Sequence, residues 1–165
     1  SCLLTFRDEA PALLGAEWTA AQAEQVMLLE EFIARRLEPQ GGGFELPLAP
    51  LRNGTALLHG HCHQKAFNAV APVQQVLGLI PELEVELVQS SCCGMAGSFG
   101  YQAETAEISR QMGELSLLPR VRAAGAEVRV VADGTSCRHQ IADGAGRDAI
   151  HVARLLRESS DLALN

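Results

Sequence analysis

The sequence has few cations, few aromatic side chains and no long apolar run. Lys65 is the only lysine among 13 basic residues, aromatic residues make up 4% of the chain, and the formal net charge is -7. Because phosphate binding needs clustered cations, this balance argues against a nucleic-acid partner. No apolar run approaches the ~18 residues that span a bilayer, and no charged-then-apolar leader opens the chain. We therefore expect a cytoplasmic protein that is not transmembrane, with any membrane association made through partners.

Cysteines are too sparse for a disulfide scaffold. The chain has five, an odd number, among 165 residues. This usage favours a reducing compartment in which thiolates serve as ligands or redox groups. The chain starts at Ser1 and Cys2 without a methionine, so we interpret it as a fragment of a longer polypeptide. Its length and 47% hydrophobic content predict a single domain over 1–165, with a helical part at 1–43 and a βα core at 53–160.

Residues 19–38 predict one long amphipathic helix. Thr19 and Gln22 have the spacing of a capping box, and apolar residues then recur at helical intervals from Val26 to Leu37 until Pro39 ends the pattern. The glycines at 41–43 and the prolines that follow predict an extended linker.

From Asn53 onward, a strand, a cysteine-containing turn and a helix follow one another three times. The predicted strands are 55–60, 83–89 and 127–132, and the predicted helices are 64–79, 102–123 with a bend at Pro119, and 148–158. Strands alternating with helices of this length predict an α/β fold, either three-layered or an open parallel sheet of βα repeats. Binding crevices in such sheets lie outside the carboxyl ends of the strands, where the sequence places Cys62, Cys92, Cys93 and Cys137.

The adjacent pair Cys92 and Cys93 is followed by a glycine-rich loop at 94–100. Adjacent thiols are difficult to explain by packing, since one side chain must point away from whatever buries the other. Gly94 and Gly97 would let backbone N–H groups approach thiolate sulfurs, and a helix N-terminus would stabilise the thiolates further. A nucleotide-binding loop is the weaker interpretation, because its glycines have a different spacing.

Other polar residues flank the cysteines. His59, His61 and His63 alternate at a strand end and would share one face if the strand extends that far. His63 and His139 are additional candidate ligands. Lys65 and Arg138 each follow a cysteine closely, where they would offset negative charge around the centre.

Thiolate ligands select zinc or iron–sulfur clusters. Zinc sites usually pair ligands two to four residues apart, and that spacing occurs here only within 61–63 and between Cys137 and His139. Adjacent cysteines suit a multi-iron cluster better, because neighbouring irons can each take one thiolate. A zinc-stabilised interaction domain and a thiol–disulfide redox domain remain alternatives.

The segments at 1–9, 59–66, 92–101 and 132–140 carry a family resemblance. They resemble the CCG cysteine-rich domain of the heterodisulfide reductase B-subunit family, which also occurs in glycolate oxidase and glycerol-3-phosphate dehydrogenase iron–sulfur subunits. These segments are most similar to the C-terminal part of large FAD-linked oxidases of the D-lactate and D-2-hydroxyglutarate dehydrogenase type. The resemblance covers the chain from Cys2 to the last predicted helix.

The resemblance implies an iron–sulfur electron-transfer domain of an FAD-dependent 2-hydroxy-acid oxidoreductase. FAD and a ferredoxin-like segment would lie elsewhere in the polypeptide or complex, and a quinone or another acceptor would receive the electrons. The isolated fragment would not oxidise a hydroxy acid. The family pattern often ends in two cysteines separated by two residues, and Gly134 occupies the first of these positions here. The remaining thiolates, Cys62, Cys92, Cys93 and Cys137, with Cys2 as a further candidate, suit an ordinary [4Fe-4S] cluster.

Overall fold

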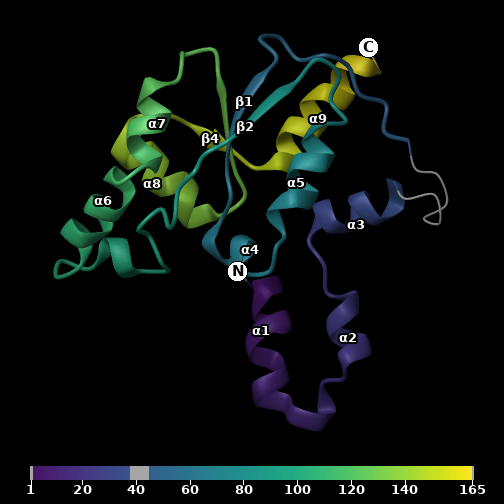
Figure 1. Ribbon diagram of the computed structural model, residues 1–165, viewed down its shortest axis with the longest axis vertical. Helices are drawn as coiled ribbons and strands as arrows, with labels where there is room; N and C mark the ends of the chain where they lie inside the picture. The colour runs from purple at the N-terminus through teal and green to yellow at the C-terminus, as the bar shows by residue number, and fades with distance from the viewer. Residues whose placement is uncertain (1, 38–44, 165) are drawn as a thin grey trace. The chain divides into compact units, whose positions relative to one another are not determined.

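The computed structural model describes residues 2–37 and 45–164 (Figure 1). The chain divides into two compact units, Ser1–Glu45 and Leu46–Asn165. The single domain predicted over 1–165 stays a prediction. The glycines at 41–43 lie outside the described residues.

The first unit is helical. Its elements are α1 (Cys2–Leu14), a short 3-10 turn (Gly15–Glu17), α2 (Ala20–Gln25) and α3 (Leu29–Leu37). Phe6 of α1 stacks on Trp18, with ring centroids 5.8 Å apart. The predicted capping box is confirmed, because the Thr19 side chain accepts from the Gln22 backbone while Gln22 accepts from the Thr19 N–H.

The predicted long helix is wrong, because the chain breaks between α2 and α3. Val26 is extended, with φ -82° and ψ 103°. The Glu31 carboxylate accepts a hydrogen bond from the Leu28 N–H at 2.8 Å and forms an ion pair with Arg7 at 2.7 Å. These contacts stabilise the start of α3, although the apolar pattern of the sequence continues through this point without a break.

The second unit contains a four-stranded parallel sheet, so the predicted α/β class is confirmed. Its strands are β1 (Thr55–His59), β2 (Glu84–Leu87), β3 (Arg129–Ala132) and β4 (Ala149–Ile150). Their order across the sheet is β2-β1-β3-β4, and every neighbouring pair is parallel. The central strand β1 is an apolar run whose last four residues are buried, as expected for a strand covered on both faces.

Helices cover both faces of this sheet. The elements are α4 (Cys62–Ala66), α5 (Val70–Leu77), a 3-10 turn (Phe99–Tyr101), α6 (Ala106–Glu114), α7 (Leu117–Ala123), α8 (Thr135–Ala145) and α9 (Val152–Ala163). Figure 1 shows α5 with α9 on one side of the sheet and α6, α7 and α8 on the other, and contacts join the members of each group. A right-handed crossover places its helices on one face of the sheet when the chain moves one way across it, and on the other face when the chain moves the opposite way. The chain changes this direction after β2, so helices cover both faces.

Two predicted helices are interrupted. The helix predicted over 64–79 divides into α4 and α5 because Asn68 takes a left-handed conformation, with φ 54°. The helix predicted over 102–123 divides into α6 and α7 at Leu115 and Ser116, so the predicted bend at Pro119 is wrong. Pro119 lies in the first turn of α7, where a missing N–H is tolerated.

The C-terminal region contains two elements that the sequence pattern does not predict. The pattern predicts a single helix over 148–158, whereas α8 follows β3 directly, β4 completes the sheet and α9 then begins at Val152. Gly146, at φ 62°, ends α8 in the left-handed conformation. Glycine favours this conformation because it has no Cβ.

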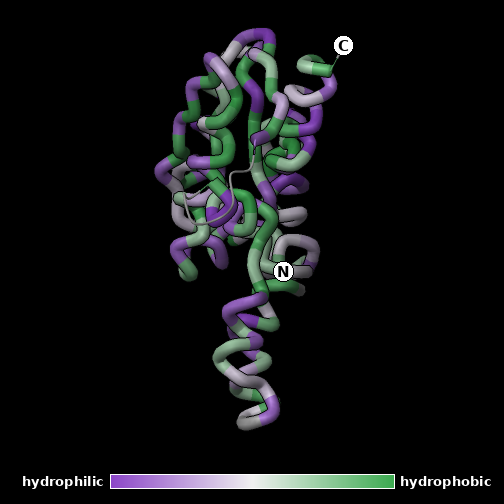
Figure 2. The backbone as a smooth tube through the Cα atoms, turned by 90° about the vertical axis from the view of Figure 1, so that its right-hand side faces the viewer, coloured by the Kyte–Doolittle hydropathy of each residue, from purple (hydrophilic) through white to green (hydrophobic). Residues whose placement is uncertain are grey.

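The core lies between the sheet and its helices. Figure 2 shows hydrophobic and hydrophilic stretches alternating along the tube, as expected of helices with one buried face. One buried cluster joins Leu57 of β1 and Val130 of β3 to Leu117, Ile141 and two cysteines, Cys93 and Cys137. Across the described residues, no helix has both the length and the apolar content needed to cross a membrane.

Leu57 tests this core. It is 1% exposed, so we expect Leu57→Ala to lower the free energy of unfolding by about 2–5 kcal/mol through lost burial and a residual cavity. Leu115→Ala is the matched control, because Leu115 is 77% exposed and its truncation should change stability by about 0.5 kcal/mol or less. Urea unfolding followed by circular dichroism measures both, and equal losses would contradict the proposed core.

Candidate metal centre

The carboxyl ends of β1, β2 and β3 bring distant segments of the chain to one edge of the sheet. From β1 the chain passes to β2, which lies on one side of β1. It then crosses to β3 on the other side of β1, and the sheet continues from there to β4. The reversal between β1 and β3 is the position where open α/β sheets form their binding crevice. Register pairs His59 with Ala132 at this point.

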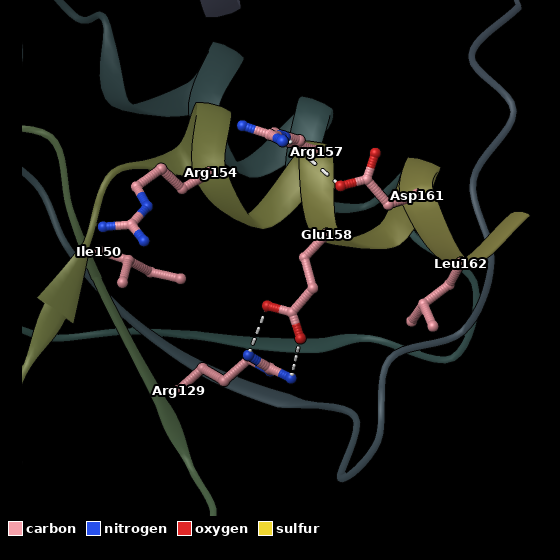
Figure 3. A pocket seen from close by; sticks show the side chains of 7 residues that line it. All are labelled: Arg129, Ile150, Arg154, Arg157, Glu158, Asp161 and Leu162. Carbon is pink, nitrogen blue, oxygen red and sulfur yellow. Dashed lines mark hydrogen bonds and ion pairs between the residues drawn. The ribbon is translucent and has the colours of Figure 1, made fainter. Parts of the chain in front are cut away.

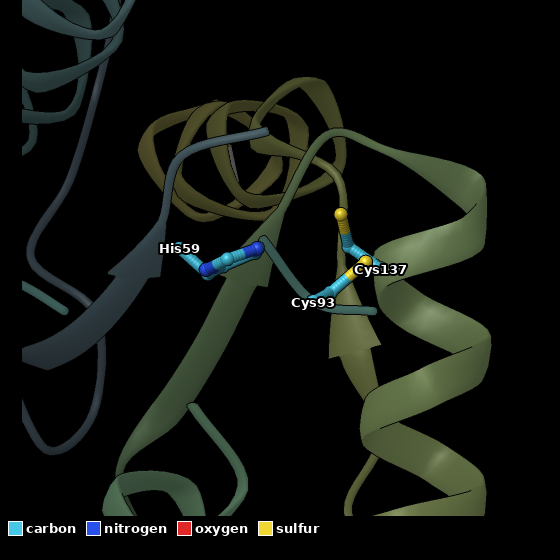
Figure 4. A group of neighbouring side chains, drawn as sticks. All are labelled: His59, Cys93 and Cys137. Carbon is cyan, nitrogen blue, oxygen red and sulfur yellow. The ribbon is translucent and has the colours of Figure 1, made fainter. Parts of the chain in front are cut away.

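His59, Cys93 and Cys137 form a buried cluster there. A ring nitrogen of His59 and the two Sγ atoms lie within 4.8 Å of one another. Figure 4 shows the imidazole pointing from the end of β1 toward the two cysteines, which come from the loop after β2 and from the first turn of α8. The three residues are at most 3% exposed. Three separate segments thus contribute one donor atom each.

Cys62 and Cys92 lie nearer to solvent. Cys62 is the first residue of α4 and is exposed, and Cys92 is partly buried. The Cys62 side chain contributes to a raised pKa of the Cys92 thiol, although burial is the larger cause. The Lys65 ammonium interacts electrostatically with Cys62, Cys92, Cys93 and Cys137. All four are free thiols.

The two buried cysteines have opposite acidities. The Cys137 thiol, donating toward Cys93, is the main reason that the pKa of Cys93 falls to about 4, with a further contribution from His59. The same interaction, together with burial, raises the pKa of Cys137 strongly. The pair therefore holds one thiolate and one thiol at neutral pH, and a thiolate is the form that binds metals.

Lys65 and Arg138 hold the loops that carry the cysteines. Lys65 Nζ donates to the Ser91 carbonyl at 3.0 Å and to the Ser90 carbonyl, and burial lowers its pKa. Arg138 donates to the carbonyls of Ala132 at 2.9 Å and Asp133 at 2.7 Å. Both cations bind backbone oxygens immediately before a cysteine-bearing segment, which is a contact that the sequence pattern did not predict.

Gly94 and Gly97 differ in their surroundings. Gly94 has φ +91°, and its N–H donates to Cys92 Sγ at 3.3 Å. A Cβ at Gly94 would lie 2.1 Å from the Ser109 carbonyl oxygen. Ser109 is itself fixed by Gln140, whose amide donates to that oxygen at 3.0 Å. Gly97 has φ +56° and no atom within 4 Å of the corresponding position.

The histidines do not share one strand face, because β1 ends at His59. His61 instead caps α4, with its Nδ1 accepting from the His63 N–H at 3.2 Å, and burial lowers its pKa. The His63 ring packs 5.7 Å from that of Phe67. His139 Nδ1 lies 2.9 Å from the hydroxyl of Tyr101, in a solvent-exposed contact. The cluster contains neither His63 nor His139, and their assignment as ligands stays a prediction.

A hydrogen-bond network joins the segments that follow β1, β3 and β4, and the sequence pattern did not predict it. Gln64 accepts from the His61 N–H at 3.0 Å and donates to the Asp133 carboxylate at 2.8 Å. The same carboxylate accepts from the Val152 N–H at 3.1 Å. Asp133 thereby connects the start of α4 with the start of α9. A polar residue at the end of an apolar strand was the available signal.

Cys2 begins α1 in the first unit, and its side chain lies outside the described residues. Its assignment as a ligand stays a prediction.

A surface groove lies elsewhere and contains no cysteine among its described lining residues. It has a volume of about 590 Å³ and is lined by Arg129, Ile150, Arg154, Arg157, Glu158, Asp161 and Leu162. Figure 3 shows Glu158 reaching from α9 to Arg129 of β3 in a two-pronged ion pair. This groove is built from surface ion pairs, so the cysteine-bearing edge is the stronger candidate site.

The donor set fits a thiophilic metal. Thiolates with an imidazole suit zinc or the iron of an iron–sulfur cluster, whereas magnesium and calcium take oxygen ligands. The buried cluster offers two sulfurs and one nitrogen, and no carboxylate is part of it among the residues that the structure describes.

Known proteins show similarity over nearly the whole chain. The chain is 28% identical to a subunit of the anaerobic glycerol-3-phosphate dehydrogenase of Escherichia coli (strain K12), over 96% of its own length and 38% of that protein. It is 32% identical to the D-2-hydroxyglutarate dehydrogenase of the same organism over 94% of its length and 14% of that protein. The corresponding enzyme of Pseudomonas putida is 30% identical over 84% of the chain and 12% of that protein. The relatives are dehydrogenases or dehydrogenase subunits.

The chain spans well under half of the length of each of these relatives. No family profile matches the chain, and no solved structure matches it.

Gly94 provides a test of the loop that carries Cys92 and Cys93. Gly97→Ala is the matched control, because it introduces only left-handed strain, about 1–2 kcal/mol. Gly94→Ala adds a collision with the Ser109 carbonyl, so its loss of unfolding free energy should exceed that of the control. Urea unfolding measures the two losses. Equal losses would contradict the close approach between this loop and α6.

The paired thiols predict a pH dependence in the metal-free, reduced protein. The folded pKa of Cys93, about 4, lies below its ordinary value of 9.0, so its contribution to stability is complete above pH 9 and is lost as the pH falls toward 4. Cys137 has a raised pKa, so its contribution is lost as the pH rises above 9. The joint contribution should therefore rise from pH 4 to pH 9 and then decrease.

The difference in unfolding free energy between wild type and Cys93→Ser, measured at several pH values, reports this contribution. Ser91→Ala is the control and should show no such difference. A Cys93→Ser difference that is constant between pH 4 and pH 9 would contradict the low pKa of Cys93.

Proposed function

We propose that this chain is the iron–sulfur electron-transfer part of a flavin-dependent 2-hydroxy-acid dehydrogenase. The cysteines Cys62, Cys92, Cys93 and Cys137 would hold a [4Fe-4S] cluster at the carboxyl edge of the sheet. The observation that carries the proposal is the convergence of two buried sulfurs and an imidazole from three separate strand ends.

The similarity to dehydrogenases supports the redox assignment. Two of the relatives are named as dehydrogenases of D-2-hydroxyglutarate, and a third is part of a glycerol-3-phosphate dehydrogenase. These names give different substrates, and the segment similar to this chain covers less than half of each relative. A shared segment among enzymes with different substrates is expected to transfer electrons rather than to recognise substrate. FAD and the substrate site would lie in the other parts of the polypeptide or complex.

The surroundings of the thiols support a cluster over an isolated ion. Two cysteines are buried and two lie nearer to solvent, so the thiols extend from the interior toward the surface. When bound, an iron–sulfur cluster supplies one-electron transfer at low cost in reorganisation. The residues of this chain would exclude water on the inner side, donate N–H groups to sulfur as Gly94 does, and place Lys65 near the negative charge.

The exposed position of Cys62 supports contact with an electron donor or acceptor. Cys62 lies at the first turn of α4 on the solvent side, so a partner could approach the centre there. The partners we propose are the flavin and ferredoxin-like parts of the same enzyme and a quinone or another acceptor.

Anaerobic preparation of the full chain with iron and sulfide tests the proposal. We expect bound iron and labile sulfide in equal amounts, and an electron paramagnetic resonance signal after reduction. Each serine variant of the four cysteines should lower the iron content several-fold or change the spectrum; these variants are Cys62→Ser, Cys92→Ser, Cys93→Ser and Cys137→Ser. Ser91→Ala is the matched control, since Ser91 precedes the pair and is exposed, and it should retain the wild-type spectrum.

The alternatives give different results. Zinc with negligible iron would identify a zinc-stabilised interaction domain. A reversible loss of two protons at a cysteine pair, seen by mass spectrometry without any metal requirement, would identify thiol–disulfide chemistry. A spectrum unchanged in Cys93→Ser would remove Cys93 from the ligand set.

A further inference from the structure

His59 is a buried histidine, and a hydrogen-bond partner is found for one of its two ring nitrogens. It is 1% exposed at the end of β1. Its Nδ1 lies 2.9 Å from the Ser90 hydroxyl, which fixes the orientation of the ring. Its Nε2 is buried and has no hydrogen-bond partner among the described residues. Nδ1 is therefore held by a hydrogen bond, and Nε2 can bind a ligand.

An unpartnered buried nitrogen requires a physical explanation. Leaving a buried polar group without a partner costs about 1–3 kcal/mol, and such groups are rare in folded proteins. The ring extends toward the two buried cysteines (Figure 4). One of its ring nitrogens lies within 4.8 Å of both cysteine sulfurs. A ligand between the nitrogen and the sulfurs would satisfy all three atoms.

The distances are close to those of metal ligands. Around one tetrahedral metal atom, a sulfur at about 2.3 Å and a nitrogen at about 2.0–2.1 Å lie roughly 3.5–3.8 Å apart. The three donor atoms are within 4.8 Å of one another, so movements on the order of 1 Å would complete the geometry. Ligating histidines usually have their second ring nitrogen fixed by a hydrogen bond, and Ser90 occupies that position here.

We propose that His59 binds a metal atom of the centre directly through Nε2, beside the sulfurs of Cys93 and Cys137. Each iron of a [4Fe-4S] cluster takes one protein ligand besides its sulfides, so in the cluster His59 would be the ligand of one iron. A single thiophilic ion could take His59, Cys93 and Cys137 together. Together with Cys62 and Cys92, the edge of the sheet then offers five donors. The inference rests on the proposed function for the identity of the metal, and it extends that function by adding a nitrogen ligand.

The other neighbouring histidine fits this role less well. His61 uses its Nδ1 to accept the His63 N–H, so in the neutral ring the proton lies on Nε2. A protonated nitrogen donates hydrogen bonds and does not bind metal. His59 remains compatible with ligation through Nε2, because its Nδ1–H can donate to the Ser90 hydroxyl and leave Nε2 unprotonated.

Pulsed electron paramagnetic resonance of the reconstituted full chain tests the inference. Direct ligation should produce strong nitrogen hyperfine coupling that changes when histidine is labelled with the heavy nitrogen isotope. The coupling should disappear in His59→Gln and persist in His151→Gln, the matched control, because His151 Nδ1 accepts from the Ala153 N–H at the start of α9. Ser90→Ala should retain the coupling with altered strength, because the ring loses its anchor. Circular dichroism establishes that each variant is folded.

Each outcome bears on a different proposal. A cluster that forms without strong histidine coupling, or whose coupling survives in His59→Gln, overturns the inference and leaves the proposed function standing. If the wild type takes up no iron–sulfur cluster, the proposed function fails, and cobalt(II) titration then tests His59 alone. A loss of cobalt affinity of at least roughly tenfold in His59→Gln would support ligation. Unchanged affinity would overturn it, and so would an equal loss in His151→Gln.

Discussion

The parallel pairing of β1 with β3 is the constraint on which the candidate site depends. Backbone hydrogen bonds fix the register, so that His59 lies beside Ala132 at the edge where both strands end. The chain after Ala132 enters α8 within a few residues, which brings Cys137 to the same edge. A parallel sheet can place donors from distant segments together only because all its carboxyl ends point the same way.

Hydrogen bonds to backbone carbonyls turn this convergence into a fixed arrangement. Lys65 of α4 reaches the carbonyls before Cys92, and Arg138 of α8 reaches those at the end of β3. Lys65 therefore joins the loop before Cys92 to the helix that carries Cys62, and Arg138 holds the turn between β3 and the helix that carries Cys137. The single lysine of the chain lies at this edge and interacts with all four thiols. Its charge and its hydrogen bonds act at one place, so its loss would affect both the loop and the electrostatics of the site.

The sequence was sufficient to predict the class of fold and the edge that carries the cysteines, because both follow from alternating apolar strands and the turns that end them. It was not sufficient for the helix boundaries. Asn68 and Val26 interrupt helices through backbone conformations that apolar spacing does not encode. Short β4 was missed because two residues carry little pattern. The alternating series of histidines did not distinguish His59, since its burial beside Cys93 depends on contacts between β1, the loop after β2 and α8 that exist only after folding.

The burial of the donors gives the centre an inner and an outer side. Cys93 and Cys137 belong to the same buried cluster as Leu57 and Ile141, so charge on that side is surrounded by apolar atoms and depends on hydrogen bonds for its stabilisation. Cys62 meets solvent on the other side. A low-dielectric interior strengthens the coupling between a buried charge and its neighbours, which accounts for the opposite acidities of Cys93 and Cys137. The inner donors would therefore govern how strongly electrons are held, and the outer thiol would govern how they enter and leave.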